Sequence, residues 1–268
     1  MNTPLITAEQ LQAQIGKGVV VIDCRFNLMD KNQGYQQYRA GHIPGAWYFH
    51  LEHDLSAPVA EHGGRHPLPG ADILADKLRR AGVNQQTPIV VYDDSRMAFA
   101  ARAWWLIRHL GHEHVAILDG GYQAWCALGG MQDRREPAPR AGNFRANFTT
   151  RDVVSYNDIQ EQKSSMTLID SREARRFAGL EEPIDPIAGH IPDALNYPWQ
   201  EVTNEQGYIK PADWHQQRWQ SLPDKHNLVV YCGSGVTACV NLLSLYLSGI
   251  EARLYPGSWS DWCSYQTH

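Results

Sequence analysis

The chain of 268 residues contains few cysteines, no long apolar run and no excess of basic residues. Its five cysteines include no Cys-x-x-C pair, which argues against a disulfide scaffold or a zinc site and favours reduced thiols. No apolar stretch approaches the roughly 20 residues of a membrane span. The formal net charge of −5 provides no electrostatic footprint for nucleic acid. We therefore expect a cytoplasmic protein that binds neither a membrane nor a nucleic acid, and no metal.

What the sequence does contain is an internal repeat. Four pairs of segments carry it: 21–25 (VIDCR) with 168–172 (LIDSR), 40–46 (AGHIPGA) with 188–194 (AGHIPDA), 89–95 (IVVYDDS) with 228–234 (LVVYCGS), and 118–125 (LDGGYQAW) with 255–262 (YPGSWSDW). Self-similarity on this scale indicates two copies of one domain. We predict domains at residues 1–132 and 151–268, joined by a linker at 133–150 that is rich in arginine, proline and alanine.

Within each copy, short β-rich runs alternate with helical stretches. Strands are predicted at 19–23, 89–92, 115–118, 168–169, 228–231 and 252–255, and helices at 71–81, 100–110, 212–219 and 238–247. Alternation of this kind is typical of the α/β class, in which helices flank a parallel sheet. We expect one such sheet in each domain.

Cys232 is the strongest candidate for chemistry. It follows the apolar run 228–231 and precedes the helical stretch 239–247, so it is expected where a strand ends and a helix begins. Backbone N–H groups of a tight loop and the positive end of a helix stabilise a thiolate there, and the thiolate is the nucleophilic form. The matching residue of the first copy is Asp93, which argues against a dry core position. We predict that Cys232 is a catalytic nucleophile.

The first copy carries an insertion. Asp23 and Asp170 are 147 positions apart, whereas Tyr92 and Tyr231 are 139 positions apart, so the first copy has extra residues after its Gly-His-Ile-Pro. The insertion falls within residues 51–70 and is rich in histidine and acidic side chains. Long polar loops often carry function, and we predict that this one does.

Two tandem domains with Gly-His-Ile-Pro, a cysteine only in the second loop, and the string CGSGVTA at 232–238 resemble the rhodanese superfamily, in particular its 3-mercaptopyruvate sulfurtransferase branch. The resemblance implies an enzyme without a cofactor. Cys232 would take sulfur from the small-molecule donor 3-mercaptopyruvate as a persulfide and release pyruvate. The sulfur would then pass to a thiol acceptor such as thioredoxin or glutathione, or to cyanide.

The same resemblance implies roles for further residues. Ser234 matches a loop serine that forms a proton relay with a histidine and an acidic residue, and His66 and Glu52 of the insertion occupy the positions of those two partners. The segment of the first copy would thus complete the site of the second. The rest of the loop that would bind substrate comprises Gly233, Gly235, Val236 and Thr237.

A carboxylate donor requires a fixed cation, and the planar fork of arginine suits it. The resemblance assigns this role to Arg176, with the neighbouring Arg175 as the alternative register. One departure concerns the branch's second arginine, whose position is here occupied by Ile184. Arg65 is a candidate substitute.

Three alternatives remain. Thiosulfate is a second donor, with sulfite as product, although loop 232–238 lacks the basic residues that thiosulfate-using relatives commonly carry. A non-catalytic sulfur carrier or interaction module is another reading, since the first copy has no loop cysteine. A Cys-x5-Arg phosphatase is disfavoured, because Ala238 stands where that arginine is needed.

Overall fold

A computed structural model of the chain describes residues 3–148 and 150–266. The chain divides into two compact units. Unit 1 consists of Met1–Ala57, Pro69–Thr149 and Glu205–Ile209, and unit 2 of Pro58–Leu68, Thr150–Asn204 and Lys210–His268. Each unit thus takes one short segment from the other half of the sequence. In the described part of the chain no helix is both long and apolar enough to cross a membrane.

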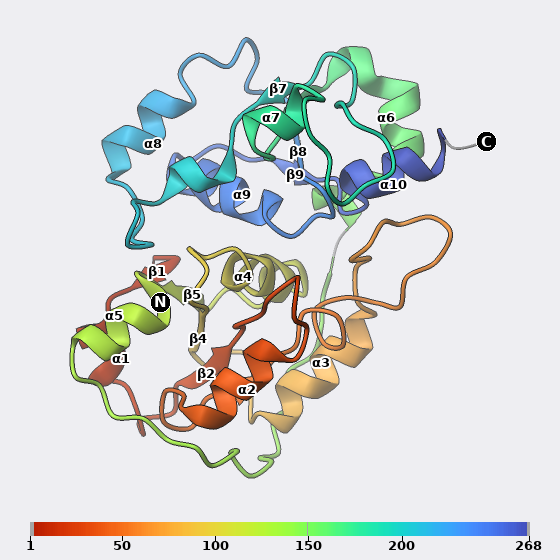
Figure 1. Cartoon of the computed structure of the whole chain (residues 1–268). Coiled ribbons are helices and arrows are strands. Elements are labelled where there is room, and N and C mark those ends of the chain that lie inside the picture. Colours follow the sequence, from red (N-terminus) through yellow and green to blue (C-terminus); the bar gives the residue numbers. More distant parts are fainter. Residues whose placement is uncertain (1–2, 149, 267–268) are drawn as a thin grey trace. The chain divides into compact units, whose positions relative to one another are not determined.

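The sheet of unit 1 is parallel, with the strand order β1-β5-β4-β2-β3. Figure 1 labels β1, β2, β4 and β5 of this sheet. Its strands are β1 (Leu5–Ile6), β2 (Val20–Asp23), β3 (Trp47–Tyr48), β4 (Ile89–Tyr92) and β5 (Val115–Leu118). The helices are α1 (Ala8–Gln12), α2 (Gln33–Ala40), α3 (Ala71–Arg80), α4 (Ala100–His109) and α5 (Gly121–Ala127).

The sheet of unit 2 is also parallel, with the order β7-β6-β8-β9. Its strands are β6 (Thr167–Asp170), β7 (Leu195–Asn196), β8 (Leu228–Tyr231) and β9 (Arg253–Leu254). The helices are α6 (Tyr156–Gln162), α7 (Ala174–Phe177), α8 (Ala212–Arg218), α9 (Ala238–Leu247) and α10 (Ser258–Ser264), with short 3-10 turns η1 (Thr150–Asp152), η2 (Lys163–Ser165) and η3 (Trp199–Val202). The predicted α/β class with a parallel sheet in each copy is confirmed.

The central strands explain why these sequences fold in this way. All four residues of β4 (IVVY) and all four of β8 (LVVY) are buried, as expected for strands of a parallel sheet covered on both faces. Each strand pairs with a neighbour on either side. The residue after each strand therefore lies at the carboxyl edge of its sheet, where α/β proteins place their sites.

A second recurring feature ties the Gly-His-Ile-Pro segment to the sheet. In unit 2 the Arg172 guanidinium donates to both carboxylate oxygens of Asp170 and to the carbonyl oxygen of Gly189, the last at 2.7 Å. In unit 1 the pair Arg25 and Asp23 repeats this pattern. Both pairs are buried, and we interpret them as structural.

The predicted linker, 133–150, packs on unit 1 up to its last residues. The backbone N–H groups of Arg140 and Gly142 donate to the carbonyl oxygens of Arg80 and Arg79, at 2.9 and 2.8 Å, and the Phe144 side chain is fully buried. Backbone hydrogen bonds and the buried Phe144 ring attach this segment to unit 1. It therefore needs no regular spacing of apolar residues.

Candidate active site

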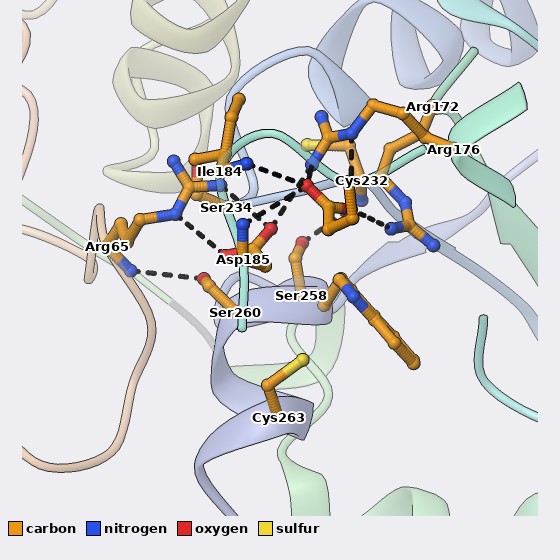
Figure 2. A network of polar contacts seen from close by, with 12 residues as sticks. Arg65, Arg172, Arg176, Ile184, Asp185, Cys232, Ser234, Ser258, Ser260 and Cys263 are labelled. Atoms are coloured by element: carbon orange, nitrogen blue, oxygen red, sulfur yellow. Dashed lines mark hydrogen bonds and ion pairs between the residues drawn. The ribbon is translucent and has the colours of Figure 1, made fainter. Parts of the chain in front are cut away.

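The loop that begins at Cys232 is fixed by the first turn of α10. The carbonyl oxygens of Cys232 and Gly233 accept hydrogen bonds from the backbone N–H groups of Trp259 (3.0 Å) and Ser260 (2.9 Å). In the other direction, the Cys232 N–H donates to Ser258 Oγ at 3.1 Å (Figure 2). The loop is therefore held between the end of β8 and α10.

Gly235 allows the loop to turn. Its φ is +73°, and an added Cβ would lie 2.3 Å from the carbonyl oxygen of Pro256. Because both the left-handed conformation and the close approach exclude a side chain, glycine is required at this position. The turn leaves the Cys232 side chain only 2% exposed.

Several backbone N–H groups of this loop remain available. Among the residues that the structure describes, none accepts a hydrogen bond from the N–H groups of Gly233, Ser234, Val236 and Thr237. The loop leads directly into α9, a helix of ten residues. Successive N–H groups of a tight turn before a helix N-terminus form a cradle for an anion.

Segment Pro58–Leu68 brings a histidine to the loop. His66 Nδ1 and Ser234 Oγ lie 2.8 Å apart, and both residues are buried. The segment is attached to α10, because the Gly63 N–H donates to Asp261 Oδ1 at 2.7 Å and the Arg65 N–H donates to Ser260 Oγ at 3.1 Å. A hydroxyl and an imidazole in direct contact can exchange a proton.

Two arginines meet beside the loop through a shared carboxylate. Arg176 Nη2 donates to Glu182 Oε1 at 2.6 Å and to Asp185 Oδ2 at 3.2 Å. Arg65 donates from Nε and Nη2 to the two oxygens of Asp185, at 3.0 and 3.2 Å (Figure 2). An added Cβ on Gly233 would lie 3.0 Å from Arg65 Nη2 and 3.6 Å from the Nη atoms of Arg176. Both guanidinium groups therefore border the residue next to Cys232.

Glu182 of this cluster is charged under ordinary conditions. Burial alone would raise the pKa of Glu182, but hydrogen bonds from Arg176 and from the backbone N–H groups of Asp185 and Ile184 outweigh it and lower the pKa below its ordinary value. Glu182 therefore stays ionised and orients Arg176.

Arg175 lies apart from the loop. It forms a surface ion pair with Glu181, and the arginine side chain is 66% exposed. The structure thus places Arg176, not Arg175, beside Gly233. Ile184 is 48% exposed and brings no charge to the cluster, and its N–H donates to Glu182 Oε1 at 3.2 Å.

Glu52 lies in unit 1, where its carboxylate forms an ion pair with Lys31 Nζ at 2.8 Å. The other predicted site residues, among them His66, belong to unit 2. Within residues 3–148 and 150–266 no group of three or more histidine, cysteine or acidic side chains is arranged to hold a metal ion.

Sequence reasoning missed the residues that hold the site in place. Asp185 and Glu182 position the two arginines, and Ser258 accepts the Cys232 N–H while donating to the Tyr255 carbonyl oxygen at 2.9 Å. The signal for the carboxylates was a group of three acidic residues, Glu181, Glu182 and Asp185, between Arg176 and the second Gly-His-Ile-Pro. Nothing in the sequence linked Ser258 to Cys232, because that contact is tertiary.

Known proteins share this architecture along nearly the whole chain. The family model for the rhodanese-like domain matches residues 7–128 and 153–265. A relative from Pseudomonas aeruginosa named "Probable 3-mercaptopyruvate sulfurtransferase" is 43% identical over 270 residues, which cover 97% of this chain and 95% of the relative. The chicken (Gallus gallus) thiosulfate sulfurtransferase is 33% identical over 258 residues, covering 93% of this chain and 88% of that protein.

A solved structure agrees with the sequence relatives. The crystal structure of the 3-mercaptopyruvate sulfotransferase SseA from Escherichia coli superimposes with a TM-score of 0.84 at 34% identity, covering 97% of this chain and all of that chain. The family match covers most of both copies, and the alignments cover 95% and 88% of the two relatives. The chain therefore belongs to the rhodanese family and is a sulfurtransferase.

Proposed function

We propose that this sulfurtransferase takes sulfur from 3-mercaptopyruvate, holds it as a persulfide on Cys232 and passes it to a thiol acceptor. The observation that carries the proposal is the buried hydrogen bond between Ser234 and His66. Ser234 lies two residues after Cys232 in the loop. Breaking a carbon–sulfur bond leaves an enolate that needs a proton, and this pair supplies a route for one. The name of the Pseudomonas relative supports the same donor.

The first half-reaction moves sulfur from the donor to Cys232. The Cys232 thiolate attacks the donor sulfur, a sulfur–sulfur bond forms, and the carbon–sulfur bond breaks with its electron pair on carbon. The proton of the donor's S–H passes through Ser234 and His66 to the enolate carbon, so the products are pyruvate and the Cys232 persulfide anion. The free N–H groups of the loop, including those of Val236 and Thr237, stabilise the thiolate before the step and the persulfide after it.

The second half-reaction needs only a nucleophile. A thiolate of thioredoxin or glutathione, or cyanide, attacks the outer sulfur of the persulfide and restores the Cys232 thiolate. Arg176 binds the donor's carboxylate with its planar guanidinium. Glu52 is assigned to the relay as its acidic member on the resemblance of the inserted segment, and its ion pair with Lys31 leaves that role a prediction.

Thiosulfate is the second candidate donor. The observation that favours it is the pair of guanidinium groups, Arg65 and Arg176, beside Gly233, because two cations suit a dianion. The absence of lysine and arginine from residues 232–238 argues for the monoanionic thiol acid instead.

Parallel assays decide between the donors. The protein is given 3-mercaptopyruvate or thiosulfate with a thiol acceptor, and release of pyruvate or sulfite is followed, with Cys232→Ser as the control. We expect pyruvate release that depends on Cys232 and exceeds sulfite release. Preferential sulfite release would overturn the choice of donor, and activity that survives in Cys232→Ser would overturn the mechanism.

A further inference from the structure

We propose that Arg65 is the second carboxylate-binding residue of the donor site and that it forms a clamp with Arg176. The inference rests on the proposed function for the identity of the donor, and on the geometry of unit 2 for the clamp. It assigns to segment Pro58–Leu68 a role in recognising the donor, in addition to supplying His66.

The two guanidinium groups are held together by one carboxylate. Asp185 accepts hydrogen bonds from Arg65 at both oxygens and from Arg176 at one, and its side chain is only 2% exposed. This buried bridge fixes the separation of the two cations. The backbone N–H of Arg65 is also bonded to Ser260 of α10, so Arg65 is anchored at both ends.

Both guanidinium groups retain donors for a ligand. Their Nη1 atoms donate to no other described residue, since the printed bonds of Arg65 use Nε and Nη2, and those of Arg176 use the same two atoms. Of the atoms nearest to a Cβ built on Gly233, the first is Arg65 Nη2 and the next two are Nη1 and Nη2 of Arg176. Two forked donors beside one glycine match the two oxygens of a carboxylate.

Charge in the cluster is balanced, which favours recognition by direct hydrogen bonds over a general positive field. Three arginines (Arg65, Arg172 and Arg176) face three acidic residues (Asp170, Glu182 and Asp185). Arg172 is 1% exposed and committed to Asp170, Glu182 and the Gly189 carbonyl. Arg65, at 30%, is the most exposed of the three, and within residues 3–148 and 150–266 its one ion-pair partner is Asp185. Its Nη1 group is therefore the best placed of the three cations to reach a ligand while the bridge to Asp185 stays intact.

Ile184 supplies no cation to the cluster. It directly precedes Asp185, and its apolar side chain can form no hydrogen bond with a carboxylate. Arg65 reaches the oxygens of Asp185 from segment Pro58–Leu68. A cation supplied from residue 65 would thus take the place of one supplied from residue 184.

The test uses two reagents that alkylate Cys232 and differ mainly in charge. Iodoacetate carries a carboxylate and iodoacetamide is neutral, so the ratio of their rates at Cys232 reports the carboxylate interaction and cancels changes in thiol reactivity. The rates are followed by mass spectrometry of the Cys232 peptide, because Cys126 is exposed and will also react. Arg65→Gln is compared with the wild type and with Arg175→Gln, a matched loss of one charge on α7.

We expect Arg65→Gln to lower the iodoacetate-to-iodoacetamide rate ratio about 10-fold, the size of one charge-assisted hydrogen bond. Arg175→Gln should leave the ratio unchanged, and the double variant Arg65→Gln/Ile184→Arg should recover part of it. An unchanged ratio in Arg65→Gln, or an equal slowing of both reagents, would overturn the proposal.

Steady-state kinetics then separate this inference from the proposed function. Arg65→Gln should raise KM for 3-mercaptopyruvate about 10- to 100-fold with little change in kcat. If the wild type releases no pyruvate while the alkylation ratio still depends on Arg65, the proposed donor is wrong and the carboxylate subsite stands. If the wild type is active and KM is unchanged in Arg65→Gln, the clamp is wrong and the proposed function stands.

Discussion

The loops that follow β4 and β8 start from similar sequences but differ in what their backbone N–H groups bind. In unit 1 the Asp93 carboxylate accepts hydrogen bonds from the N–H groups of four residues of its own loop and helix, at distances of 2.8 to 3.1 Å: Ser95, Met97, Phe99 and Ala100. In unit 2 Cys232 replaces Asp93, and loop N–H groups such as those of Val236 and Thr237 have no acceptor among the described residues. In unit 1 the loop N–H groups bind the carboxylate of Asp93. In unit 2 the corresponding loop leaves N–H donors for an anionic ligand.

The comparison shows what the duplication changed. Burial raises the pKa of Asp93, while the hydrogen bonds from Ala100, Ser95 and Phe99 oppose that rise. A carboxylate built into the loop occupies the donors that an anionic sulfur species would need. We therefore propose that unit 1 keeps the fold without the chemistry, whereas in unit 2 the loop lies beside His66 and the arginine cluster.

The largest expected effect is on kcat, when the proton relay is removed and the reactivity of Cys232 is kept. His66→Gln and Ser234→Ala should each lower kcat for pyruvate release by about 10²- to 10⁴-fold, because the enolate loses its proton source. Alkylation of Cys232 by iodoacetamide should continue at a similar rate in both variants. His53→Gln serves as the control and should retain wild-type kcat. A kcat unchanged in both relay variants would contradict the assigned role.

The next effect tests how much the Asp93 carboxylate contributes to the free energy of unfolding. Asp93→Ala leaves several buried N–H groups without an acceptor, so the free energy of unfolding should fall by about 2 kcal/mol or more. Asp94→Ala, at the neighbouring position, should have a smaller effect because Asp94 does not hold the four loop N–H groups that Asp93 accepts and its side chain accepts from Ser95 Oγ at 3.3 Å. Urea denaturation measures both variants. Equal losses in the two variants would refute the comparison.

The smallest effect concerns pH. The pKa of Glu182 is lower in the folded chain than in the unfolded one, so this residue contributes stability that is present above its ordinary pKa and is lost as the pH falls through the folded value. Glu182→Gln should therefore lose unfolding free energy relative to the wild type at neutral pH, and the difference should shrink towards about pH 3. Denaturation at several pH values checks this, and a difference that grows on acidification would contradict it.

Much of the fold was predictable from the sequence, because the central strands are continuous apolar runs and the repeat provides each of them twice. Strands β4, β5 and β8 have the predicted bounds, and helix α9 lies within the predicted stretch. The edge strands β1, β3 and β7 are two residues long and leave no period to detect. Helices α5 and α10 escaped detection since they begin in glycine-containing segments that are typical of turns.

A site residue was predictable only where its position in the sequence or its match to a known motif pointed to a function. Cys232 stands out by its place between a strand and a helix, and His66 by its resemblance to a known relay. The resemblance predicted that part of the insertion completes the site of the second copy, but the contacts that attach Pro58–Leu68 carry no sequence signal. They are hydrogen bonds to Ser260 and Asp261 of the undetected α10. Asp185 likewise acts through contacts with residues distant in the sequence.

Mass spectrometry of the protein after a short exposure to 3-mercaptopyruvate without an acceptor tests the central claim most directly. We predict that the Cys232 peptide gains the mass of one sulfur atom, that one pyruvate is released for each modified chain, and that adding a thiol removes the sulfur. Sulfur found on another cysteine, or pyruvate released without any modification of Cys232, would contradict this account.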